Sequence, residues 1–339
     1  MTDNALLHLG EEPRFDQIKT EDIKPALQTA IAEAREQIAA IKAQTHTGWA
    51  NTVEPLTGIT ERVGRIWGVV SHLNSVADTP ELRAVYNELM PEITVFFTEI
   101  GQDIELYNRF KTIKNSPEFD TLSPAQKTKL NHDLRDFVLS GAELPPEQQA
   151  ELAKLQTEGA QLSAKFSQNV LDATDAFGIY FDDAAPLAGI PEDALAMFAA
   201  AAQSESKTGY KIGLQIPHYL AVIQYADNRE LREQIYRAYV TRASELSDDG
   251  KFDNTANIDR TLANALQTAK LLGFKNYAEL SLATKMADTP EQVLNFLHDL
   301  ARRAKPYAEK DLAEVKAFAR ESLNLADLQP WDLGYASEK

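Results

Sequence analysis

The sequence has 339 residues, of which 44% are hydrophobic and 25% charged, a composition typical of a folded protein rather than a disordered one. Its formal net charge is −17, from 51 acidic and 34 basic residues, which disfavours partners such as nucleic acid and anionic membranes. The absence of cysteine excludes disulfides, thiolate metal sites and cysteine nucleophiles.

The N-terminal residues 1–15 have neither the basic segment nor the apolar core of a secretory signal. No window of the sequence approaches the eighteen uninterrupted apolar residues that a transmembrane helix requires. The sequence therefore predicts a cytoplasmic protein with no membrane partner.

Helical periodicity begins near the N-terminus and continues through most of the chain. Within residues 21–44, apolar residues recur every three, four or seven positions and form one face of a helix: Ile23, Leu27, Ile31, Ile38 and Ile41. The sequence has no fixed-period repeat of the kind that marks tetratricopeptide or HEAT arrays. We therefore expect irregular helices rather than a solenoid.

Three helix starts are marked by a hydroxyl residue that precedes a proline. The pairs are Thr79-Pro80, Ser123-Pro124 and Thr289-Pro290, each with an N-cap hydroxyl and a proline at the first helical position. A glutamine follows three residues after Ser123 and after Thr289, which predicts a capping box at both sites.

A long helix is expected after Pro146, because residues 147–177 contain only Gly159 as a helix-weakening residue. Beyond it, residues 210–216 alternate apolar and polar side chains, and residues 177–183 resemble a partner strand. Residues 191–203, between them, predict a short helix. The expected fold is all-α, predominantly helical and elongated, with one small two-stranded β element. A soft division near residue 176 would separate helical residues 1–175 from residues 176–339.

Searches for catalytic motifs fail over the whole chain. Glycine-rich phosphate loops and the G-x-S-x-G motif are absent. The six histidines are His8, His46, His72, His132, His218 and His298. None has a partner four residues away and H-E-x-x-H does not occur, although folding could still bring histidines together. We therefore predict no catalytic and no metal-binding residue here, and the substrate-binding residues stay unknown.

Arg242 is the most informative charged residue in the segment 225–246. Four apolar residues share one arc of the expected helix: Leu231, Ile235, Ala238 and Leu246. Arg242 falls in the middle of this arc, flanked by Tyr236 and Tyr239. One interpretation is that Arg242 binds a substrate carboxylate in a cleft. The favoured one is a substantially buried ion pair, for example with an acidic residue of the segment 253–260.

The same region carries a family resemblance. The stretch NRELREQIYRAYVTRASE at 228–245, the stretch 261–297 and the ending PWDLGYASEK at 330–339 resemble the zinc oligopeptidases of the thimet oligopeptidase family, most closely the bacterial ones. The similarity extends back to FDQIKTEDIKPAL at 15–27, so it covers essentially the whole chain. Gly334 and Ala336 depart from the bulkier residues that the family often has.

The resemblance implies the helical N-terminal half of a metallopeptidase, with the catalytic half missing. In this family the H-E-x-x-H helix and the further glutamate ligand lie in the C-terminal half, so none can be carried over to a position here. The intact enzyme would use a zinc-bound water to hydrolyse short peptides, and this half would form a wall of the substrate channel. We expect no cofactor in this chain, and expect the chain alone to be inactive.

Other interpretations stay open. The chain could be a helical scaffold or peptide-binding protein that has no catalytic half, or it could hydrolyse peptides through an unseen site. If it is half of an enzyme, its partners are the missing half and short peptides. An exposed apolar surface, including Trp331 and Tyr335, would then be expected where the other half packs, and could drive self-association.

Overall fold

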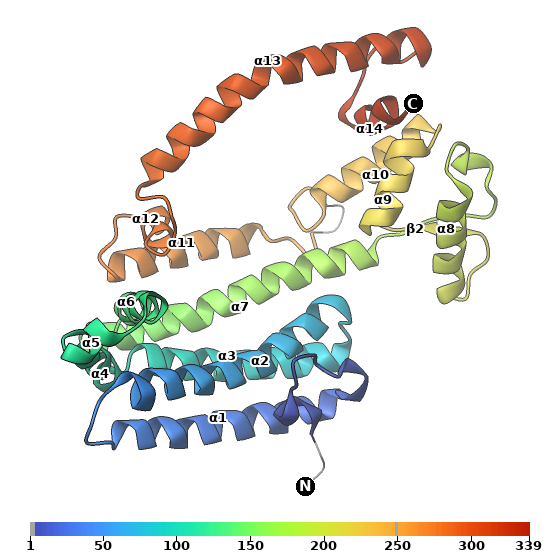
Figure 1. Ribbon diagram of the computed structural model, residues 1–339. Coiled ribbons are helices and arrows are strands. Elements are labelled where there is room, and N and C mark those ends of the chain that lie inside the picture. Colours follow the sequence, from blue (N-terminus) through green and yellow to red (C-terminus); the bar gives the residue numbers. More distant parts are fainter. Residues whose placement is uncertain (1–3, 248–249) are drawn as a thin grey trace. The chain divides into compact units, whose positions relative to one another are not determined.

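The computed structural model describes residues 4–247 and 250–339 (Figure 1). The structure is 74% helical, and its described part contains one two-stranded antiparallel sheet, so the predicted all-α class is confirmed. No helix within this part is long and apolar enough to cross a membrane. The contacts group the chain into two compact units, which are described separately below.

The first unit comprises Met1–Gln161 and Asn264–Lys275. Its helices are α1 (Thr20–Lys42), α2 (Glu54–Val76), α3 (Pro80–Gly101), α4 (Ile104–Lys114), α5 (Pro117–Thr121), α6 (Pro124–Leu139) and the first part of α7 (Pro146–Ala176). Short 3-10 helices at Ala5–His8 and Phe15–Gln17 precede α1, and a π-helical turn at Trp49–Val53 leads into α2. The last turns of α11 (Thr255–Leu271) complete the unit.

The apolar face predicted for α1 forms the centre of this unit's core. All five of its periodic residues are buried, together with apolar residues of α2, α3 and α4. Three polar pairs join the outer edge of α1 to α3 at a constant separation of 64 residues: Lys24–Glu88, Gln28–Glu92 and Arg35–Glu99. Because the separation is constant, α1 and α3 run parallel.

The predicted helix starts are confirmed in detail. The side chains of Thr79, Ser123 and Thr289 accept hydrogen bonds from the backbone N–H three residues later. Ser123 and Gln126 form the complete capping box that the sequence predicts. At α13 (Pro290–Ser322) the box differs, because the Gln292 side chain accepts from the N–H of Asp288 rather than that of Thr289.

The second unit comprises Leu162–Ala263 and Asn276–Lys339. After the second part of α7 come β1 (Ile179–Phe181), a 3-10 helix (Ala185–Leu187), α8 (Glu192–Ser204), β2 (Tyr210–Ile212), α9 (Ile216–Tyr225) and α10 (Arg229–Thr241). The first turns of α11 follow, and then α12 (Tyr277–Leu282), α13 (Pro290–Ser322) and α14 (Pro330–Glu338).

The predicted strand pair and the helix between its strands are confirmed, but both strands are shorter than the predicted segments 177–183 and 210–216, and Ile216 begins α9 instead. The antiparallel strands β1 and β2 pair with Ile179 opposite Ile212, and α8 connects them. Gly209 enters β2 at φ +84°, and a Cβ there would lie 2.1 Å from the carbonyl oxygen of Phe181. Only glycine therefore fits this turn. Fully buried Phe198 and Ile235 place α8 and α10 in the core of the second unit.

The long helix α7 runs without interruption through Gly159, as the sequence predicts. Asparagine side chains of the α11 segment bond to it. Asn264 Nδ2 donates to the carbonyl of Leu155 in the first unit, and Asn169 Nδ2 donates to the buried Asn254 Oδ1 in the second. The helix ends at Ala176, where the sequence places a soft division of the chain; that division stays a prediction.

Candidate functional site

The histidines do not form a metal centre in the described residues. Five of the six are exposed and scattered over several helices and loops. Across residues 4–247 and 250–339, no three His, Asp or Glu side chains are placed to hold a metal ion. The described residues therefore offer no set of zinc ligands.

His218 is the one buried histidine in the described structure. Its Nδ1 accepts a hydrogen bond from the N–H of Gly213 at 3.0 Å, and its ring packs on Phe198 with centroids 4.9 Å apart. Burial lowers the pKa of His218, and the charge of Lys211 lowers it further. The side chain is thus a neutral imidazole in the core. Its hydrogen bond to Gly213 links the residue that follows β2 to α9.

The densest polar site of the second unit joins α10 to α14. Asp332 is fully buried and accepts a hydrogen bond from Arg232 Nη2 at 2.8 Å. Arg229 Nε and Nη2 reach the same carboxylate at 2.7–3.1 Å. The N–H of Gln329 adds a bond at 3.1 Å and caps α14. Although burial opposes ionisation, the hydrogen bonds from Arg229 and Arg232 hold the pKa of Asp332 below its usual range.

Other polar residues of the PWDLGYASEK segment contact α9, α10 and the loop between these helices. The hydroxyl of Tyr335 donates to Asp227 Oδ1 at 2.7 Å, and its ring lies 4.1 Å from the guanidinium carbon of Arg232. The hydroxyl of Tyr225 donates to Glu338 at 2.9 Å. These contacts hold α14 on α9 and α10. The role that they give to the motif is structural.

The prediction for Arg242 is wrong in two respects. The helix α10 ends at Thr241, so Arg242 is its C-cap rather than a residue on its apolar face, and it is only partly buried. It contacts no carboxylate among the described residues, including those of the segment 253–260. Its Nη1 donates to the carbonyl of Tyr239 instead. The buried ion pair expected at Arg242 exists at Arg232, which the sequence interpretation missed.

The apolar surface predicted at Trp331 and Tyr335 is also misplaced. Both side chains are partly buried, and Trp331 packs against the core of the second unit. Exposed apolar side chains lie instead along α13, whose described residues include only one buried member, Ala319. The exposed residues are Leu294, Phe296, Leu297, Leu300, Tyr307, Leu312 and Phe318.

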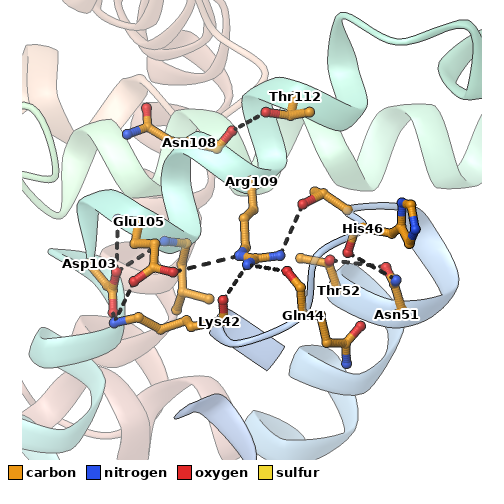
Figure 2. A network of polar contacts seen from close by, with 12 residues as sticks. Lys42, Gln44, His46, Asn51, Thr52, Asp103, Glu105, Asn108, Arg109 and Thr112 are labelled. Atoms are coloured by element: carbon orange, nitrogen blue, oxygen red, sulfur yellow. Dashed lines mark hydrogen bonds and ion pairs between the residues drawn. The ribbon is translucent and has the colours of Figure 1, made fainter. Parts of the chain in front are cut away.

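A second arginine-centred network lies in the first unit, between the end of α1 and α4 (Figure 2). Arg109 donates to the backbone carbonyls of Lys42 and Gln44 and to the hydroxyl of Thr47. Lys42 Nζ bonds to Asp103 at 2.7 Å, which raises the pKa of Lys42, and Asp103 caps α4. The network holds the loop that follows α1 against α4.

Two family models match the chain. The N-terminal domain of neurolysin and thimet oligopeptidase matches residues 27–149, which run from α1 into the start of α7. Peptidase family M3 matches residues 222–339, which contain α10, α14 and the Arg232–Asp332 pair. The first match lies in the first unit, and the second lies in the second unit except for Asn264–Lys275, which belong to the first.

Curated relatives agree with these matches. Oligopeptidase A of Haemophilus influenzae is 44% identical over 337 residues, which are 99% of this chain and 50% of that protein. Oligopeptidase A of Escherichia coli is 44% identical over 99% of this chain and 50% of its own length. The probable cytosolic oligopeptidase A of Arabidopsis thaliana is 38% identical over 100% of this chain and 49% of its own.

The chain thus spans about half the length of the curated relatives it matches. The matched domain models and the 44% identity over 99% of the chain agree with the family resemblance that the sequence motifs carry. This chain belongs to peptidase family M3, the family of thimet oligopeptidase and oligopeptidase A, and corresponds to the N-terminal half of such a protein.

Proposed function

We propose that this chain is the substrate-channel-forming N-terminal part of a cytoplasmic, zinc-dependent oligopeptidase that hydrolyses short peptides. The observation that carries the proposal is the 44% identity to oligopeptidase A along 99% of the chain. The zinc ligands and the catalytic glutamate are supplied by the other half of the protein, because the described residues offer no metal-binding cluster. The chain alone is inactive.

The exposed face of α13 supports a further partner, the other half of the protein. Leu297 and Leu300 are 50% and 53% exposed and Phe296 is 67% exposed, on a helix of 33 residues. Apolar side chains gathered on one element usually mark a surface that another protein segment covers. The catalytic half packs on this face in the intact enzyme.

The test compares this chain with a longer protein that includes the sequence encoded after Lys339. A quenched-fluorescent peptide and metal analysis after dialysis are applied to both. The proposal expects chelator-sensitive cleavage and about one zinc per molecule for the longer protein, and neither for the 339-residue chain. Cleavage by the 339-residue chain itself, or no cleavage by the longer protein, would overturn it.

A helical scaffold is the second candidate, and the apolar face of α13 is the observation that favours it. A scaffold would use this face to dock a separate protein rather than a catalytic half. The reading frame after Lys339 separates the two, because a scaffold requires no H-E-x-x-H motif there. A longer protein that has the motif and hydrolyses the peptide excludes the scaffold.

A further inference from the structure

Three tyrosines and Arg242 form a cluster on one side of the second unit. Tyr219 of α9 stacks on Tyr239 of α10, with centroids 4.0 Å apart and planes at 22°. The guanidinium carbon of Arg242 lies 3.8 Å from the centroid of Tyr239. Tyr236 lies beside Trp331, with centroids 6.0 Å apart. We call these four residues (Tyr219, Tyr236, Tyr239 and Arg242) the tyrosine–arginine cluster.

Only one polar group of this cluster has a hydrogen-bond partner among the described residues. Arg242 Nε is buried and makes no hydrogen bond, and the guanidinium has one bond, from Nη1 to the carbonyl of Tyr239. Among residues 4–247 and 250–339, the hydroxyls of the three tyrosines also find no acceptor or donor. Burial raises the pKa of Tyr219, with Tyr236 and Tyr239 adding to the rise and Arg242 opposing it.

Arg242 has no carboxylate partner among the described residues, unlike the other arginines of α10. The protein has 51 acidic residues against 34 basic ones, and the described arginines beside it on α10 are paired, Arg232 with Asp332 and Arg237 with Glu233. Guanidinium groups favour bidentate pairing with carboxylates. The neutral tyrosine hydroxyls beside Arg242 can donate to the same anion without repelling it.

We propose that the tyrosine–arginine cluster binds a carboxylate of a short peptide, with Arg242 as the principal donor. The proposal rests on the proposed function, since it names how this half would hold a peptide substrate. Tyrosine and arginine dominate peptide and protein recognition because they combine apolar faces with hydrogen-bonding ends. The stacked rings of Tyr219 and Tyr239 supply such faces next to the guanidinium.

The carboxylate has two sources, the C-terminus of the peptide or an acidic side chain, and three probes distinguish them. The probes are an N-acetylated apolar pentapeptide with a free C-terminus, the same peptide amidated, and the amidated peptide with one internal glutamate. Each is titrated into the 339-residue chain by isothermal titration calorimetry. At least one carboxylate-bearing probe is expected to bind about tenfold or more tightly than the neutral one.

Matched variants assign the effect to Arg242. Arg242→Gln is expected to remove the preference for the carboxylate. Arg237→Gln deletes the same charge five residues earlier, within α10, and is expected to keep this preference. Arg242→Lys keeps the charge but loses the planar fork, so intermediate affinity is expected. Tyr239→Phe keeps the stacked ring and removes one hydroxyl, and should weaken carboxylate binding several-fold. Far-UV circular dichroism verifies that each variant is folded.

Three results would overturn the inference: equal affinity for the three probes, a carboxylate preference that survives in folded Arg242→Gln, or no binding of any probe at millimolar concentration. These results concern binding to this half and leave the hydrolysis test of the longer protein untouched. Conversely, carboxylate-dependent binding through Arg242 would stand even if the longer protein failed to cleave peptides. The two proposals therefore fail separately.

Discussion

Arg109 in the first unit and Arg232 in the second are both largely buried, yet their charges are balanced differently. The side chain of Arg109 is 13% exposed and its nearest carboxylate, Glu105, is 3.9 Å away and half exposed. It bonds mainly to backbone carbonyls (Figure 2). Arg232 is 1% exposed and bonds at 2.8 Å to Asp332, which is 0% exposed.

Both arginines donate to backbone carbonyls, since Arg232 Nη1 also bonds to the carbonyl of Ala226, but only Arg232 has a buried carboxylate as its counter-charge. The carbonyls around Arg109 lie at the end of α1, where water can replace a lost donor. Water does not reach the carboxylate of Asp332, which is 0% exposed. Removing this carboxylate would leave the charge of Arg232 in a dry core. Breaking a buried ion pair is costly because the remaining charge keeps its desolvation penalty without its Coulombic compensation.

The largest expected effect is therefore that of Asp332→Ala. This change should destabilise the second unit by about 3–5 kcal/mol, because Arg232 stays buried without a counter-charge. Thermal unfolding of the variant and the parent measures the loss. Asp327→Ala is the matched control, since Asp327 is exposed on the same segment and its backbone carbonyl, which accepts from Arg229, is retained. A loss under 1 kcal/mol for Asp332→Ala would contradict a tight dependence on one partner.

Arg109→Ala should have a smaller effect, of about 1–3 kcal/mol, because its acceptors can be rehydrated. The same thermal measurement applies, with Arg62→Ala as the control. Arg62 pairs with Glu33 on the surface of the same unit, both about 40% exposed, and its loss should cost about 0–1 kcal/mol. If Arg109→Ala destabilised as much as Asp332→Ala, the proposed difference between carbonyl and carboxylate partners would be wrong.

Arg242→Ala should destabilise least of the three arginine-site changes, by about 1 kcal/mol. The partly buried side chain loses one hydrogen bond and one cation–π contact with Tyr239. Thermal unfolding beside Asp332→Ala would show the contrast directly. A loss of 3 kcal/mol or more would indicate a buried carboxylate partner after all.

Local signals explain which parts of this fold could be predicted. The helix starts at Ser123 and Thr289 can be predicted because each capping hydroxyl and the backbone N–H that donates to it lie within four residues. The strand pair was predictable because alternation at 210–216 has a period that a helix cannot produce. These features depend on neighbours in the chain, and the structure contains each of them.

Long-range pairing explains which parts could not be predicted. Arg232 and Asp332 are 100 residues apart, and nothing near either one identifies the other. The one local signal for a buried Arg232 is that it directly follows Leu231, a member of the apolar arc of α10, and therefore lies at the edge of that arc. The helical period favours Arg242 only if the helix continues beyond Thr241, where no glycine or proline marks its end. The backbone leaves the helix where Ala243 adopts a φ of +54°, and alanine gives no signal of such a turn in the sequence.

The smallest expected effect is a pH dependence of the stability of the second unit, caused by the titration of His218. Burial keeps its folded pKa below the ordinary 6.5, so the unfolded chain binds more protons between the two values. The stability it contributes is complete above pH 6.5 and falls as the pH drops toward the folded value. The contribution of Asp332, whose pKa is also lowered, is complete above 3.8 and is lost only below that.

Unfolding free energies measured between pH 7.5 and pH 5 therefore report the titration of His218 without that of Asp332. The stability of the second unit should decline with a slope below about 1.4 kcal/mol per pH unit, the limit for one proton. His218→Gln should flatten this decline, because glutamine can accept the Gly213 N–H bond but does not titrate. Replacing exposed His298 with glutamine is the control and should leave the slope unchanged. An equal slope in His218→Gln and the parent would show that the imidazole is not the group responsible.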